Sequence, residues 1–82
     1  ATIPKDVEDK INDIAMPNLA NSARNYAASM AAEGYTPEQI SAVFAGGFNK
    51  GFAWDSFNED KANIIKASFG APPTNKLSKI GK

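Results

Sequence analysis

Apolar residues near the start of the chain recur at the spacing of an α-helix. They are separated by four, four and three positions, which places them on one helical face. Pro4 suits the first turn of this helix, because a residue there needs no amide proton for an intrahelical bond. Pro17 would clash with the preceding turn of a continuous helix, so we expect a break or kink near Met16. The residues of the apolar face are Ile3, Val7, Ile11 and Ile14.

A second helix is predicted from Asn18 to Glu33. Alanine is frequent in this segment and no β-branched residue occurs in it, so helix propensity and apolar period agree. Gly34 predicts the end of the helix, since glycine readily adopts the left-handed conformation that follows a helix. The apolar stripe of this helix consists of Leu19, Ala23, Tyr26 and Met30.

Thr36 begins the most clearly signalled helix of the chain. Pro37 follows at the first helical position, and Gln39 stands where its side chain completes a capping box with Thr36. Tyr35 and Ile40 flank this start at the positions of a hydrophobic staple. The apolar arc then continues as far as Trp54, so we expect the helix to extend to that region and to break before Asn58. The arc consists of Ile40, Val43, Phe44, Gly47, Phe48, Gly51 and Trp54.

A last helix is predicted after this break, with Asp55, Ser56 or Asn58 as its cap and Gly70 as its end. No segment alternates apolar and polar residues over a useful length, so a sheet has little support. The fold class is therefore all-α: a small bundle of three to four helices over residues 1–70, followed by an extended basic tail over residues 71–82. The inward residues expected for the last helix are Ala62, Ile65 and Phe69, with Phe57 and Ile64 beside them.

The composition fits one small folded domain. The chain has 82 residues, of which 43% are hydrophobic and 22% charged, and a chain this short has a thin core. Its longest apolar run, residues 42–48, is much shorter than the roughly 20 residues needed to cross a bilayer. There is no cysteine, so the redox compartment stays open, and a start at Ala1 is compatible with loss of either a signal peptide or a methionine.

The chain contains no histidine and no cysteine, the residues that most often act as base or nucleophile near neutral pH. We therefore expect no enzymatic activity and no cofactor. Asp6, Asp9 and Asp13 lie close together in the sequence, but they lack the loop spacing of a calcium site. Carboxylates at the start of a helix are favoured by its dipole, which accounts for this cluster without a metal.

Charge is distributed unevenly along the chain. Residues 61–82 contain five lysines and no acidic residue, whereas all nine acidic residues precede them. In the tail, Leu77 and Ile80 alternate with three of these lysines, Lys76, Lys79 and Lys82. The tail is thus expected to contact an anionic molecule or the protein's own acidic surface, or to be a solvated end. Three lysines give only weak, salt-sensitive contact with phosphates.

Two glycines stand in the middle of the apolar arc that follows Thr36. A glycine inside a helix costs about 1 kcal/mol relative to alanine, so Gly47 and Gly51 suggest a place where another backbone approaches closely. That backbone is either the small face of the second helix at Ala23 and Ala27, or a partner helix. In the second case Trp54 would be an exposed anchor.

The resulting functional hypothesis is a small interaction protein without catalytic activity, acting in assembly, as an adaptor or as an inhibitor, of the kind that viruses and mobile elements encode. It would bind a larger protein or a second copy of itself. The alternative is an accessory protein that meets nucleic acid through its tail. The expected protein-binding residues are Phe44, Gly47, Phe48, Gly51 and Trp54, and the expected tail contacts are Lys76, Leu77, Lys79 and Ile80.

Overall fold

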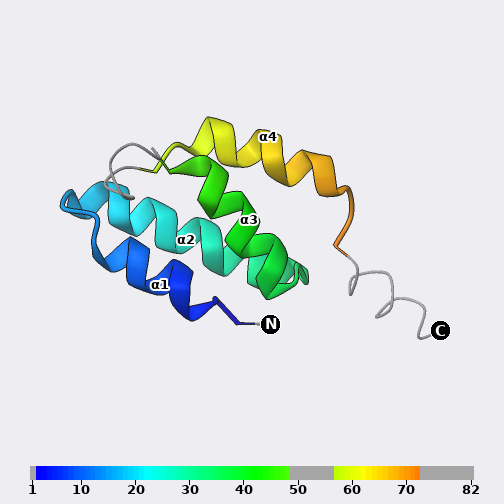
Figure 1. The fold of residues 1–82 in the computed structure, drawn as a ribbon, viewed down its shortest axis with the longest axis horizontal. Helices are drawn as coiled ribbons and strands as arrows, with labels where there is room; N and C mark the ends of the chain where they lie inside the picture. Colours follow the sequence, from blue (N-terminus) through cyan, green and yellow to red (C-terminus); the bar gives the residue numbers. More distant parts are fainter. Residues whose placement is uncertain (1, 49–56, 73–82) are drawn as a thin grey trace.

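The computed structural model describes residues 2–48 and 57–72, and these residues form four helices (Figure 1). The only pairing outside helices among them is a single antiparallel bridge between Phe48 and Phe57. The all-α bundle expected from the sequence is therefore confirmed. The helices are α1 (Lys5–Asn12), α2 (Pro17–Glu33), α3 (Pro37–Gly47) and α4 (Glu59–Phe69).

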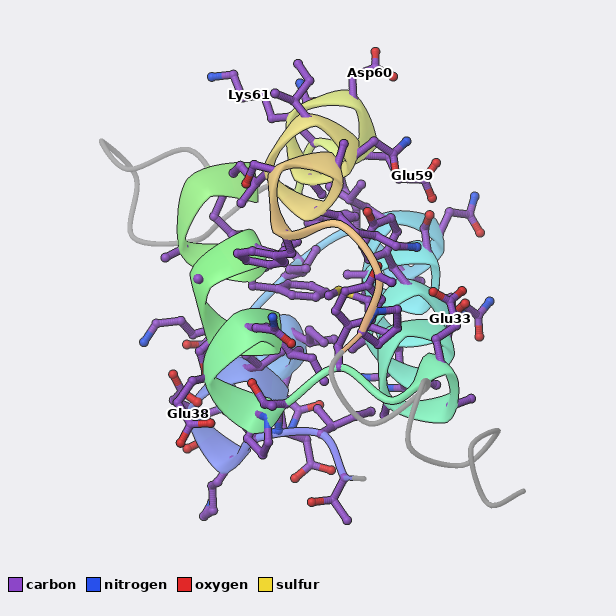
Figure 2. The ribbon with its side chains drawn as sticks, turned by 90° about the vertical axis from the view of Figure 1, so that its right-hand side faces the viewer. Glu33, Glu38, Glu59, Asp60 and Lys61 are labelled. Carbon is purple, nitrogen blue, oxygen red and sulfur yellow. The ribbon has the colours of Figure 1, made fainter. Side chains whose placement is uncertain are left out.

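Helices α2 and α3 form the middle of the bundle. Seen from the end of the molecule, α4 lies above this pair and α1 lies below it (Figure 2). Helix α1 packs against both α2 and α3, whereas the main neighbour of α4 is α3. The two outer helices thus cover opposite sides of the central pair.

The helix boundaries before Phe44 follow the sequence signals closely. The Gln39 amide donates to the Thr36 hydroxyl over 3.1 Å, and the Thr36 amide donates to the Gln39 side chain over 3.0 Å, which completes the expected capping box. Gly34 ends α2 in the left-handed conformation, with φ of 103°. Pro17 is the first residue of α2, so the break expected near Met16 is also confirmed.

The core contains small side chains from α2 and α4 and larger ones from α1, α2 and α3. Alanines of α2 and α4 allow the helices to approach one another, while the largest fully buried side chains fill the space between α1, α2 and α3. No buried side-chain nitrogen or oxygen among the described residues lacks a hydrogen-bond partner. The largest fully buried side chains are Val7, Ile11, Met30, Ile40, Val43 and Phe44.

Helix α3 ends earlier than its apolar arc predicts. Gly47 is its last residue, and Phe48 has extended backbone with φ of −93° and ψ of 156°. The Gly47 carbonyl accepts a 2.8 Å hydrogen bond from the Asn58 amide, which holds the start of α4 against the end of α3. The expectation of a helix that continues to Trp54 is wrong, because Phe48 leaves the helix to pair with Phe57.

Helix α4 begins and ends at expected residues. The Asn58 side chain caps it by accepting a 3.0 Å hydrogen bond from the Lys61 amide, and Gly70 follows its last turn with φ of 75°. Ile64 differs from expectation, since 70% of its surface is exposed. Among the described residues, no helix combines the length and apolar character required to span a membrane.

Candidate interaction surfaces

Three of the residues expected to bind a partner lie inside the bundle. Phe44 is fully buried, Phe48 is 3% exposed, and Gly47 is also buried. In this conformation these residues contact their own chain and present little surface to another molecule. The other expected contacts lie outside the described residues: Gly51, Trp54, Lys76, Leu77, Lys79 and Ile80.

Phe44 and Phe48 belong to an aromatic cluster that also contains Tyr26 and Phe57. The rings of Phe44 and Phe57 are stacked, with centroids 4.9 Å apart and planes 16° apart. The ring centroid of Phe48 lies 5.6 Å from that of Phe57, and Tyr26 and Phe57 make an edge-to-face contact with centroids 5.6 Å apart. Phe57 therefore joins the end of α3 to α2, and packing within one chain accounts for the apolar face at Phe44 and Phe48.

The close approach expected around Gly47 does occur, but its partner is α4. A β-carbon at Gly47 would lie 3.2 Å from the Phe57 ring and 3.4 Å from the β-carbon of Ala62. A β-carbon at Gly46 would overlap the end of the Ile65 side chain. The glycines predict close approach of either the small face of α2 or a partner helix, but the start of α4 occupies this place instead.

The outward side of α4 forms an exposed ridge, which we call the α4 ridge. At about 100° per residue, its members occupy one arc of the helix, opposite the inward residues Ala62, Ile65 and Phe69. The spacing of the inward residues already contains this signal, because Ile64 lies about 100° away from Ile65 around the helix. Figure 2 shows Asp60 and Lys61 pointing away from the bundle. The α4 ridge consists of Asp60, Lys61, Ile64, Ala67 and Ser68.

A row of polar contacts, the polar seam, fixes the rotation of α4 about its axis. The Tyr26 hydroxyl donates to the Asn63 side chain over 2.7 Å, and Lys66 lies 3.4 Å from the Glu33 carboxylate. These contacts connect α4 to α2 along one edge, while Ile65 meets α3 at Gly46. With both edges held, Ile64 has to point outward. The polar seam consists of Ser22, Tyr26, Glu33, Glu59, Asn63 and Lys66.

Lys66 and Tyr26 are electrostatically linked. The Lys66 ammonium lies 5.5 Å from the centre of the Tyr26 ring and 5.7 Å from that of Tyr35, distances at which a cation is attracted to the ring face. Burial raises the pKa of Tyr26 above its ordinary value, and the carboxylates of Glu59 and Glu33 add to this shift. The phenol is therefore kept neutral and available as a hydrogen-bond donor to Asn63.

The chain beyond α4 is attached to the turn between α2 and α3. The Tyr35 hydroxyl donates to the Gly70 carbonyl over 3.1 Å, and the Tyr35 ring lies 6.3 Å from that of Phe69. Pro72, the last described residue, is buried. Residues 70–72 are thus held beside the turn between α2 and α3.

A shallow, open groove of about 450 Å³ lies between the first residues of the chain and the second half of α2. Its floor is mostly apolar, and Glu8 is the only charged residue among the described ones that line it. We call it the N-terminal groove. Its lining residues are Thr2, Ile3, Glu8, Ala28, Ala31 and Ala32.

Two of the three carboxylates that were considered for a cation site contact other side chains. Asp9 pairs with Lys5 at 3.1 Å, and Asp6 accepts a 3.2 Å hydrogen bond from Ser41. Within residues 2–48 and 57–72, no three histidine, cysteine or acidic side chains are grouped so as to hold a metal ion.

Two exposed features of the described chain thus remain as candidate contact surfaces, the α4 ridge and the N-terminal groove. They differ in shape, since the ridge protrudes and the groove is concave. Known protein families, curated proteins and solved structures were each compared with this chain, and no match was found.

Proposed function

We propose that this chain is a protein-interaction domain that binds a larger protein through the α4 ridge. The observation that carries the proposal is the 70% exposure of Ile64, a large apolar side chain at the middle of the ridge. Ala67 lies one turn further along the same arc, and its small side chain lets another surface approach the helix backbone. Helices that dock in a groove do so through apolar residues three or four positions apart, which is the spacing of Ile64 and Ala67.

The size of the ridge favours a larger partner over a second copy. Helix α4 has 11 residues and is therefore about 16 Å long, so two such helices side by side cover much less than the roughly 1,200 Å² of a stable interface. A groove in a larger protein would surround the ridge on three sides and bury more of it. All five residues of the α4 ridge are exposed, so the ridge is accessible to such a groove.

An adaptor, assembly or inhibitor role is consistent with this mode of binding, because each requires recognition of a protein without chemistry. Contact with nucleic acid has no comparable support from the described residues, in which carboxylates outnumber basic groups. Repulsion between these carboxylates and a phosphate backbone would oppose such binding.

Ile64→Asp tests the proposal, with Met16→Asp as its matched control. Met16 is also a large exposed apolar residue, 60% exposed, but it lies between α1 and α2. The partner would be identified with a photo-crosslinking residue at position 64 and then purified. We expect titration calorimetry to show binding by the wild type and Met16→Asp, and at least about tenfold weaker binding by Ile64→Asp, a loss of roughly 1.4 kcal/mol.

Circular dichroism would first establish that both variants remain folded. Equal affinity of the two variants for the purified partner would refute the proposal. So would sedimentation showing that the wild type forms a stable dimer which Ile64→Asp dissociates, because the ridge would then bind a second copy.

A further inference from the structure

The N-terminal groove lies near the last described residues of the chain, 70–72. Ala31 and Ala32 in the last turn of α2 line the groove, and Gly34 ends that helix. Tyr35 comes next, and its hydroxyl holds the Gly70 carbonyl at 3.1 Å. Figure 1 shows the chain after α4 turning back toward the end of α2. Residues 73–82, which we call the C-terminal segment, therefore begin near one end of the groove.

We propose that the C-terminal segment of the same chain binds in the N-terminal groove. An extended residue spans about 3.3 Å, so Leu77 can lie roughly 17 Å from Pro72 and Ile80 roughly 26 Å from it. The lining residues of α2, from Ala28 to Ala32, extend over only about 6 Å of the helix axis. The segment is thus long enough to enter the groove with both apolar residues.

The side chains of the segment match the lining of the groove. Ile3 and three alanines supply an apolar floor of modest depth, which suits two isolated apolar side chains, Leu77 and Ile80. Glu8 supplies a carboxylate at the same place. The segment contains three lysines and no acidic residue, so its charge is opposite to that of the groove.

The end of α2 adds a second electrostatic attraction. The last turn of a helix has partial negative charge on its free carbonyl groups, and α2 has no basic residue in that turn. Glu33 adds a carboxylate there, with Lys66 of α4 as its partner. Lysines of the C-terminal segment would supply the positive charge that the last turn of α2 lacks.

Paramagnetic relaxation in the full-length protein tests this contact. The chain has no cysteine, so Ser78→Cys provides a single attachment point for a nitroxide label. We expect the amide signals of Thr2, Ala28 and Ala32 to lose more than half their intensity relative to the same protein with its nitroxide reduced. Signals at Ile64 on the α4 ridge should be retained.

Charge variants provide the matched control. Glu8→Lys reverses the charge of the groove and Glu38→Lys makes the same change at an exposed residue of α3 outside it. We expect Glu8→Lys, or 0.5 M salt, to restore the signals of Ala28 and Ala32, and Glu38→Lys to leave them attenuated. Circular dichroism of both variants would show whether the bundle is intact.

Three results would overturn the proposal. The first is an absence of attenuation in the groove, and the second is stronger attenuation at another surface. The third is attenuation in a mixture of two kinds of chain, one isotope-labelled without nitroxide and the other carrying the nitroxide without isotope label. Attenuation there would show that the groove binds the segment of a second copy.

Discussion

Tyr26 contributes to two parts of the structure at once. Its ring packs edge-on against Phe44 and Phe57, and its hydroxyl donates to Asn63 in the polar seam. Tyrosine suits this position because its ring is apolar and its hydroxyl can reach a polar partner at the edge of the core. The stability of the α2–α4 contact therefore depends on the protonation of one phenol.

We predict that the protein loses stability above about pH 10 partly because Tyr26 ionises. Its pKa is raised from 10.0 in the folded state, so the folded chain holds the phenolic proton more tightly than the unfolded chain. This contribution is fully present below pH 10 and is lost as the pH rises through the folded-state pKa. Denaturant unfolding at several pH values would measure it.

Absorbance at 295 nm would follow the ionisation directly. The phenol ionisation that is shifted to high pH should be absent in Tyr26→Phe and retained in Tyr35→Phe. Tyr26→Phe should also lose less stability than the wild type above pH 10. At neutral pH, loss of the hydrogen bond to Asn63 should cost Tyr26→Phe about 1 kcal/mol. An unchanged high-pH profile in Tyr26→Phe would contradict the assignment.

The elements of this fold were largely predictable, and the exception has a physical cause. Capping residues and prolines act locally, so Pro17, Gly34 and Thr36 marked their boundaries correctly. The end of α3 depends instead on a contact between residues far apart in sequence. Phe48 continues the helical apolar period, but in the structure it is extended and paired with Phe57, a pairing that periodicity alone does not reveal.

The predicted binding residues show the same limit. Periodicity correctly identified Phe44 and Phe48 as parts of an apolar face, but it could not say whether another molecule or the same chain covers that face. Phe57 of the same chain covers it. The apolar character of Ile64 predicts a place beside the inward residues, but its position around the helix favours exposure, and it is exposed in the structure.

We predict that Gly46 and Ile65 are energetically coupled across α3 and α4. Gly46→Ala alone gains helix propensity but forces the Ile65 side chain to move. Ile65→Val removes the Cδ1 atom that the new methyl group would meet. In a double-mutant cycle measured by denaturant unfolding, Gly46→Ala should therefore be more favourable in the Ile65→Val background, by about 1 kcal/mol.

Gly46→Ala in an Ile64→Val background is the control for this cycle, because Ile64 faces solvent on the same helix. The two changes should there be additive to within about 0.5 kcal/mol. Additivity in the Ile65 cycle as well would show that α3 and α4 are not in close contact at Gly46.

Buried alanines allow the helices of the bundle to pack closely against one another. Ala23, Ala27 and Ala62 are fully buried, and larger side chains at these positions would push neighbouring helices apart. In a chain of 82 residues such a change has a large relative effect, because the total stability of a small domain is only about 5–15 kcal/mol.

We predict that Ala27→Leu lowers the free energy of unfolding by about 1–3 kcal/mol, the usual cost of overpacking. Ala45→Leu is the matched control, because Ala45 is exposed on α3 and its change should be within about 0.5 kcal/mol of neutral. Thermal unfolding would separate the two variants, since each kcal/mol corresponds to about 4–8 °C in a domain of this size. Similar melting temperatures for both would mean that α2 is less tightly enclosed than the structure indicates.

The contact between α3 and α4 also bears on how freely this protein can change its sequence. On the α3 side it depends on glycines and on the α4 side on Ala62 and Ile65, while the polar seam holds α4 against α2. None of these residues belongs to the α4 ridge, so selection for folding acts weakly on the ridge itself. The bundle is therefore a scaffold on which the outward residues of α4 can diverge, or be replaced by a grafted recognition helix, while the fold stays the same.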